Sequence, residues 1–220
     1  MHITSGGGVA QTSLWTSGFT RGKIEVCLLR VPLVNPDAEA ASGPPGPPRR
    51  SGKRREPRVL ISCLPRMFSD ERNARIDHYD TLDLAGLLVL ERHSPRDVDL
   101  LVSIGRHYLK QHQFDRCHDY YSRALAVDPD DGWTHLFMGN LCYGLSCYDE
   151  AAAYFRNAIE LLPEVACPHW CLADVYDKQG YWERTEHHYR RAVEVDPTDT
   201  KSKQKLEDWL ADNRSARQNS

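Results

Sequence analysis

The chain has 220 residues, of which 40% are hydrophobic and 27% charged, and its formal net charge is −3. That length suffices for one domain of ordinary size plus tails. The longest apolar run of the body, residues 84–90, is too short to span a bilayer. The seven cysteines are an odd number without framework spacing, which argues against a secreted disulfide scaffold. We therefore expect a soluble protein in the reducing cytoplasm.

Residues 1–66 differ in composition from the remainder. They hold ten Lys/Arg against four Asp/Glu, whereas the remainder holds 18 against 27. The stretches "SGGG" and "ASGPPGPPRRSGKRREPR" are of low complexity and lack a helical period, so we expect a disordered, basic, Pro/Gly-rich arm. The abrupt change of pattern suggests the hypothesis that translation begins at Met67. An intact mass of the native protein that starts at Met1 would refute it.

Residues 67–97 predict an N-terminal packing element. The stretch "RIDHYDTLDLAGLLVLERH" indicates a helix over 74–92, and its phase also allows a degenerate repeat that ends at Pro95. The "SPRD" stretch after it is typical of a helix start. Ser94 would be the N-cap, Pro95 would take the first helical position, and Asp97 would complete a capping box.

Three blocks of equal length follow without a gap, at 98–131, 132–165 and 166–199. Pro129, Pro163 and Pro197 occupy the same position near the end of each block, and a proline disfavours helix at the residue before it. Equivalent positions hold a small residue, then an aromatic residue, then alanine: Gly105, Gly139 and Ala173; Tyr121, Phe155 and Tyr189; Ala124, Ala158 and Ala192. The helical period places these on one buried face, so each block predicts a pair of helices joined by a turn.

The C-terminal stretch "KSKQKLEDWLADNR" predicts a capping helix over 200–214. Leu206, Trp209 and Leu210 form one apolar stripe, and charged residues cover the other side. A repeat array needs a polar-backed end of this kind. Residues 215–220 would be a tail.

Residues 98–199 resemble the tetratricopeptide repeat family. The likeness is carried by many positions that agree three times in register, although Leu101, His135 and His169 stand where the family has tryptophan, and Cys117 and Thr185 replace its usual alanine. The resemblance implies an all-α fold, a right-handed α-solenoid of helix–turn–helix units. It also implies that the first helix of each unit lines a concave groove that binds peptide segments of other proteins.

The resemblance gives the candidate peptide-binding residues by their positions on the first helices. They are Arg106, Lys110, Trp133, Phe137, Asn140, Tyr143, Trp170, Asp174 and Lys178. Aromatic anchors beside a few polar groups suit a protein-binding surface, and Arg106 and Lys110 would favour an acidic flank on the ligand. The alternative is that the aromatic side chains only pack against neighbouring helices.

Three other activities are less well supported by the residues. Some family members hold a partner's C-terminal carboxylates, but the equivalent positions here are Val102, Arg106, Phe137, Cys167 and Cys171, so almost the whole clamp is missing. Cys167 and Cys171 with His135 or His169 suggest a metal site, although two cysteines at helical spacing more often simply pack. The arm "RRSGKRREPR" has the charge density for nucleic acid but no interleaved aromatic residues.

We find no glycine-rich phosphate loop, nucleophile elbow or paired catalytic carboxylates in the sequence. The sequence therefore predicts a non-enzymatic scaffold or adaptor that needs no metal or cofactor and binds a protein or peptide partner. Nucleic-acid association through the arm and Cys/His metal binding remain the alternatives, and self-association stays open.

Overall fold

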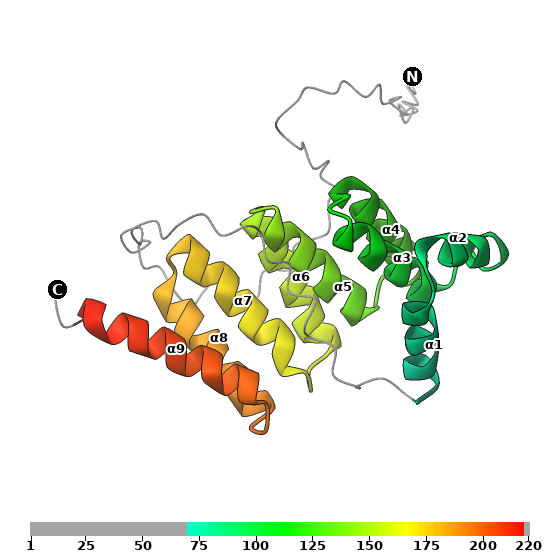
Figure 1. The fold of residues 1–220 in the computed structure, drawn as a ribbon. Helices are drawn as coiled ribbons and strands as arrows, with labels where there is room; N and C mark the ends of the chain where they lie inside the picture. Colours follow the sequence, from blue (N-terminus) through cyan, green and yellow to red (C-terminus); the bar gives the residue numbers. More distant parts are fainter. Residues whose placement is uncertain (1–69, 218–220) are drawn as a thin grey trace, which may run out of the picture. The chain divides into compact units, whose positions relative to one another are not determined.

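The computed structural model describes residues 70–217, and the regular secondary structure within them is all helix (Figure 1). The expectations for the arm 1–66 and for a start at Met67 lie outside the described residues. The helices are α1 (Asp70–Thr81), α2 (Leu84–His93), α3 (Val98–Lys110), α4 (Phe114–Val127), α5 (Gly132–Gly144), α6 (Tyr148–Leu161), α7 (Ala166–Gln179), α8 (Trp182–Val195) and α9 (Thr200–Arg217). None of these helices is long and apolar enough to cross a membrane.

The six central helices form three antiparallel pairs, α3 with α4, α5 with α6 and α7 with α8. Each pair lies within one of the three blocks, and the proline of that block comes shortly after the second helix ends. Neighbouring pairs stack, so α3, α5 and α7 follow one another along the array (Figure 1). Their buried residues make one continuous hydrophobic core.

The small-residue position is where each first helix meets an aromatic ring of its second helix. A Cβ built on Gly105 would lie 2.5 Å from Cε1 of Tyr121, and one on Gly139 would lie 2.5 Å from Cε1 of Phe155. Both rings are fully buried. The glycines are therefore required for close approach of ring and backbone, while the third unit accommodates Ala173 with Tyr189.

The first helices α3 and α5 are capped by aspartates at equivalent positions of the repeat. The Asp97 side chain accepts a hydrogen bond from the amide of Leu100, and that of Asp131 accepts one from the amide of Thr134. Asp97, and not the expected Ser94, is thus the N-cap of α3, and Pro95 lies in the turn before the helix. The carboxylate of Asp97 satisfies an amide of the first turn, which fixes the start of the helix there.

The single helix expected over 74–92 is instead two helices. Asp83 interrupts it, because its side chain accepts a hydrogen bond from the amide of Gly86 at 2.8 Å and starts α2. α1 and α2 both pack on α3. The alternative of a degenerate repeat that ends at Pro95 lies partly outside the described residues. Figure 1 shows α1 and α2 diverging from their short connection.

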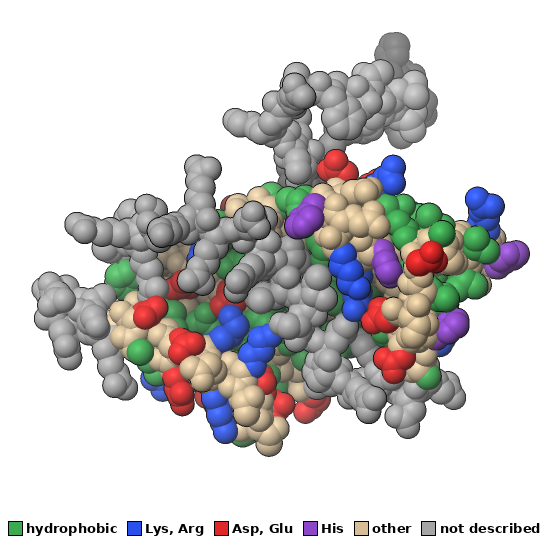
Figure 2. Space-filling model, in the orientation of Figure 1, with side chains coloured by type: hydrophobic (Ala, Val, Ile, Leu, Met, Phe, Trp, Pro, Cys, Tyr) green, Lys and Arg blue, Asp and Glu red, His purple; other side chains and the backbone are tan. Residues whose placement is uncertain are grey.

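The C-terminal helix α9 continues to Arg217, beyond the expected end at residue 214. It packs on α8 and α7, with Trp209 buried and its indole nitrogen 2.9 Å from a carboxylate oxygen of Asp177. In Figure 2, acidic and basic side chains are interspersed over the exposed side of α9. This polar outer side is what the end of a repeat array requires.

Candidate functional site

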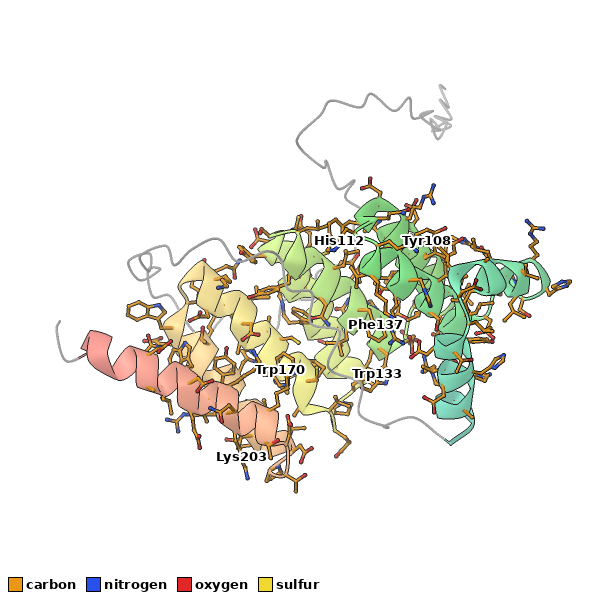
Figure 3. The ribbon with its side chains drawn as sticks, viewed as in Figure 1. Tyr108, His112, Trp133, Phe137, Trp170 and Lys203 are labelled. Carbon is orange, nitrogen blue, oxygen red and sulfur yellow. The ribbon has the colours of Figure 1, made fainter. Side chains whose placement is uncertain are left out.

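The nine predicted site residues lie on α3, α5 and α7, and we call this surface the first-helix face. The structure buries Arg106, Trp133, Asn140 and Trp170, leaves Phe137, Tyr143 and Asp174 half-buried, and exposes Lys110 and Lys178. Figure 3 shows Trp133, Phe137 and Trp170 along α5 and α7. The two tryptophans are thus part of the core, as in the packing alternative, and the aromatic residues that remain accessible are Phe137 and Tyr143.

The cap helix α9 covers the end of the face at α7. The ammonium groups of Lys201 and Lys205 lie 4.6 and 4.7 Å from the centre of the Trp170 ring. Lys205 also donates to Asp174 at 2.6 Å, and the hydroxyl of Tyr189 donates to the same carboxylate. Cation–π contacts of this kind contribute about 0.5–2 kcal/mol each. Trp170 is therefore held in place as a structural side chain.

The helix α1 covers the opposite end of the face. The Arg106 guanidinium donates through Nη1 to both carboxylate oxygens of Asp80 on α1, at 3.1 and 3.2 Å. Arg106 therefore does not form the expected basic edge, because it is buried and its charge is balanced by Asp80. Of that predicted edge, only Lys110 is exposed to solvent.

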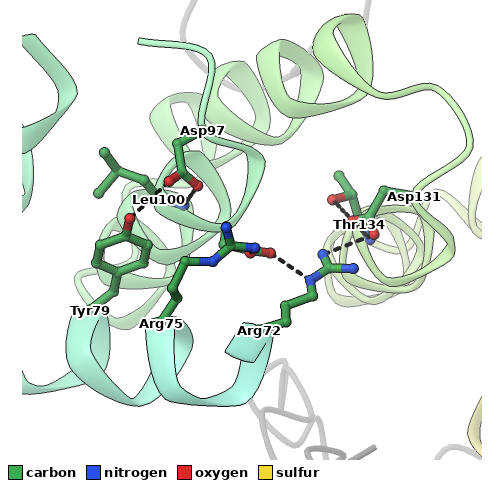
Figure 4. Close-up of polar contacts among 8 residues, drawn as sticks. Arg72, Arg75, Tyr79, Asp97, Leu100, Asp131 and Thr134 are labelled. Carbon is green, nitrogen blue, oxygen red and sulfur yellow. Dashed lines mark hydrogen bonds and ion pairs between the residues drawn. The ribbon is translucent and has the colours of Figure 1, made fainter. Parts of the chain in front are cut away.

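Two arginines attach α1 to the N-terminal ends of α3 and α5 (Figure 4). Arg72 reaches Asp99 through Nε at 2.7 Å and Asp131 through Nη2 at 2.9 Å. Arg75 binds the other oxygen of Asp99 at 2.9 Å, and the Tyr79 hydroxyl donates to Asp97 at 2.8 Å. Burial and the bond to Asp97 raise the pKa of Tyr79 to about 12, so the phenol stays neutral.

Reasoning from sequence missed the ion pairs and hydrogen bonds that these residues form. Two signals were available: the arginines at helical spacing in "DERNARID", and the aspartates at equivalent positions before the first helices of two blocks. Neither signal says that the two groups meet, because α1 lies outside the repeat and its direction is not set by the repeat period.

A small pocket lies between α1, α3 and α5. Its lining combines carboxylates, a buried guanidinium and apolar side chains: Arg72, Ile76, Asp99, Val102, Ser103, Arg106, Asp131, Trp133 and Phe137. The buried Nε of Arg106 has no hydrogen-bond acceptor there. An unsatisfied buried donor costs about 1–3 kcal/mol. The pocket, of about 10 Å³, has room for about one water molecule beside it.

The middle of the face is formed by α5 and α7. The thiols of Cys167 and Cys171 are 3.9 Å apart, and Cys171 lies 3.8 Å from the side-chain oxygen of Asn140. Within residues 70–217, no three Cys, His, Asp or Glu side chains come together as metal ligands. Burial and the nearby Asp174 raise the pKa of Tyr143 above its ordinary value, so this residue is a neutral hydrogen-bonding phenol.

Solved structures share this arrangement of helices. A fragment of MamA from Desulfovibrio magneticus RS-1 is 17% identical, with a TM-score of 0.56 over 68% of this chain and 89% of that one. The tetratricopeptide protein TTC0263 of Thermus thermophilus is 19% identical, with a TM-score of 0.54 over 58% and 71%. The chain has the tetratricopeptide-repeat fold. The predicted all-α solenoid is thereby confirmed.

Comparisons by sequence reach only part of the molecule. No protein-family model matches the chain. It is 26% identical to protein bimA of Emericella nidulans over 111 residues, 48% of this chain and 14% of bimA. It is 27% identical to the mouse protein O-mannosyl-transferase TMTC1, over 50% of this chain and 12% of that protein. The matched tetratricopeptide region is thus a small share of either relative's length.

Proposed function

We propose that this tetratricopeptide protein is a non-catalytic adaptor that binds a segment of another protein along the first-helix face. The observation that carries the proposal is that Phe137 and Tyr143 on α5 stay partly accessible, although α1 and α9 cover other parts of the face and Phe137 borders the pocket beside α1. Half-buried aromatic side chains held by a rigid helix are suited to anchor a ligand, because little conformational freedom is lost on binding.

Opposite charges lie at the two ends of the helices that form the face, so a bound segment would have a preferred orientation. Carboxylates gather at the N-terminal ends of α3 and α5, whereas the exposed Lys110 and Lys178 stand near the C-terminal ends of α3 and α7. A ligand acidic at one end could pair with these lysines while its apolar residues contact Phe137 and Tyr143. Such opposite charges chiefly set orientation and association rate.

The buried thiols are consistent with an adaptor and not an enzyme. Burial raises the pKa of Cys117 and of Cys142 to about 12, so both remain protonated and unreactive near neutral pH. Cys117, Cys142 and Cys147 are free thiols. We place the adaptor in the cytoplasm, where thiols stay reduced.

The test is an affinity pulldown from the native host. Wild-type bait would be compared with Phe137→Ala/Tyr143→Ala and with a matched pair on the second helices, Tyr120→Ala/Tyr154→Ala, after circular dichroism shows that all three fold. Specific partners lost only with the Phe137/Tyr143 pair would support the proposal. Partners retained by that variant, or lost equally with both, would contradict it.

A further inference from the structure

We propose that the N-terminal ends of α3 and α5 form a docking site for an arginine-bearing helical segment of a partner protein, and that α1 is the displaceable occupant of this site. The inference rests on the proposed function, because it specifies one class of segment that enters the first-helix face. The site consists of Asp97, Asp99 and Asp131 with the adjoining pocket that contains Val102 and Phe137.

The contacts of α1 are mostly polar and only partly buried, unlike those of a core helix. Within the side chains that the structure describes in α1, none is fully buried, and Arg72, Ile76 and Tyr79 are only partly covered. By contrast, the next helix buries Leu87 completely. α1 is therefore attached mainly through ion pairs and hydrogen bonds, which water and salt can replace more readily than apolar burial.

The surface beneath α1 is built for positive charge. The side chains of Asp99 and Asp131 are only 6% and 4% exposed, yet their described cationic partners, Arg72 and Arg75, both come from α1. Buried carboxylates need such partners, because an uncompensated charge is costly in a desolvated position. Any segment that displaces α1 must therefore bring arginines to the same place.

The geometry of α1 defines the segment that would fit. Arg72 and Arg75 are one helical turn apart on the same face, and Ile76 follows toward the apolar lining of the pocket. A partner helix with two arginines at this spacing followed by an aliphatic residue would repeat these contacts. Arginine suits the site better than lysine, since Arg72 spans two carboxylates through separate nitrogens.

The contacts of α1 satisfy only part of the hydrogen-bonding capacity of Arg106. Asp80 accepts from Nη1 of that guanidinium, but Nε faces no acceptor although it is buried in the pocket wall. A partner segment that placed a carbonyl or carboxylate oxygen against Nε would gain a hydrogen bond that α1 lacks.

The experiment uses the full chain and a fluorescent peptide with the sequence of residues 70–83. We expect it to bind Arg72→Glu/Arg75→Glu, whose own α1 is repelled from the site, at least about ten-fold more tightly than wild type. The charge-matched control Arg190→Glu/Arg191→Glu, on the exposed side of α8, should behave as wild type. The same peptide with both arginines changed to glutamate should not bind. Equal affinity for variant and wild type would overturn the inference.

A second readout does not depend on the variant. Hydrogen exchange of α1 in the wild-type chain should accelerate when the unlabelled peptide is added in excess, while α6 stays unchanged. Protection of α1 that is unaltered at saturating peptide would also overturn the inference. Both readouts use a synthetic peptide and no host protein, so they can fail while the pulldown that tests the proposed function succeeds, and the reverse.

Discussion

Single residues set how closely the helices approach, and the glycine shared by the first two units is the clearest case. The ring of Phe155 packs directly against the backbone of Gly139. The sequence identified this position as small in all three units, because the repeat period compares it three times. It did not identify the partner ring as the reason, since that requires the packing of one helix on the other.

Replacing Gly139 with alanine should therefore destabilise the fold. The added Cβ would lie 2.5 Å from the Phe155 ring, which is fully buried and has little room to shift. We expect the free energy of unfolding to fall by about 1–3 kcal/mol, measured by chemical denaturation. In Gly139→Ala/Phe155→Leu the combined loss should be smaller than the sum of the two single losses. Strict additivity would contradict a direct clash.

The histidine pair of the third unit predicts a pH dependence. His169 and His188 lie with their Nδ1 atoms 3.3 Å apart. Burial, with nearby positive charge, lowers the pKa of His169 to about 4 and that of His188 to about 3, from an ordinary value of 6.5. Below pH 6.5 the unfolded chain therefore binds protons that the folded chain does not, so stability is complete above this pH and falls as pH drops toward 3.

The measurement is thermal unfolding as a function of pH. In His169→Gln/His188→Gln the decline of the melting temperature between pH 6.5 and pH 4 should be shallower than in wild type. The matched control His78→Gln/His93→Gln removes two exposed histidines and should keep the wild-type slope. A slope that the first pair leaves unchanged would mean that these histidines are not held neutral.

At the scale of elements, the turns inside the repeats share one backbone conformation. His112, Ser146 and Gly180 occupy the same position in the three blocks and all have positive φ, at 58°, 65° and 81°. Only glycine adopts this region without steric cost. The repeat therefore carries a small strain in its first two turns and relieves it in the third.

Removing glycine from one of these turns and adding it to another should change the free energy of unfolding in different ways. Gly180→Ala places a side chain at positive φ and should lower the free energy of unfolding by about 1 kcal/mol. Ser146→Gly removes such a side chain and should be neutral or stabilising by less than about 1 kcal/mol. Both are read from denaturant midpoints. If both substitutions lowered the free energy of unfolding equally, the positive φ of Ser146 would not be a source of strain.

The elements that the sequence predicted are those repeated in register. The helix pairs could be predicted because each position occurs three times, and their prolines mark the ends of the second helices. The break at Asp83 could not be predicted, since it lies in a stretch that occurs once and has a helical apolar period on both sides. A capping carboxylate outweighed that period, which is a local competition that periodicity alone does not resolve.

At the scale of the molecule, the array is closed at both ends by charged contacts. Two lysines of α9 cover Trp170, and two arginines of α1 bind carboxylates of α3 and at the start of α5. The predicted site could be located to the first helices but not divided into buried and accessible residues. That division depends on how α1 and α9 fold back on the array, and nothing in the repeat period encodes it.

The attachment of α1 should be sensitive to ionic strength. Salt shortens the range of electrostatic attraction from about 14 Å near 50 mM to about 4 Å near 500 mM. We expect the amides of α1 to exchange faster with solvent at the higher salt, whereas those of α6, held by apolar burial, keep their protection. Hydrogen-exchange mass spectrometry resolves the two segments. Parallel changes in both helices would indicate global destabilisation instead.

The central claim, that partners bind along the first-helix face, is tested most directly by site-specific photo-crosslinking in the native host. The photoreactive amino acid p-benzoyl-phenylalanine would be placed at Phe137 and, as controls on the second helices, at Tyr120 and at Tyr154. We predict a discrete covalent adduct with another protein from Phe137 and none from either control. Adducts from the controls without one from Phe137 would show that the working surface lies on the second helices, and the proposed site would be wrong.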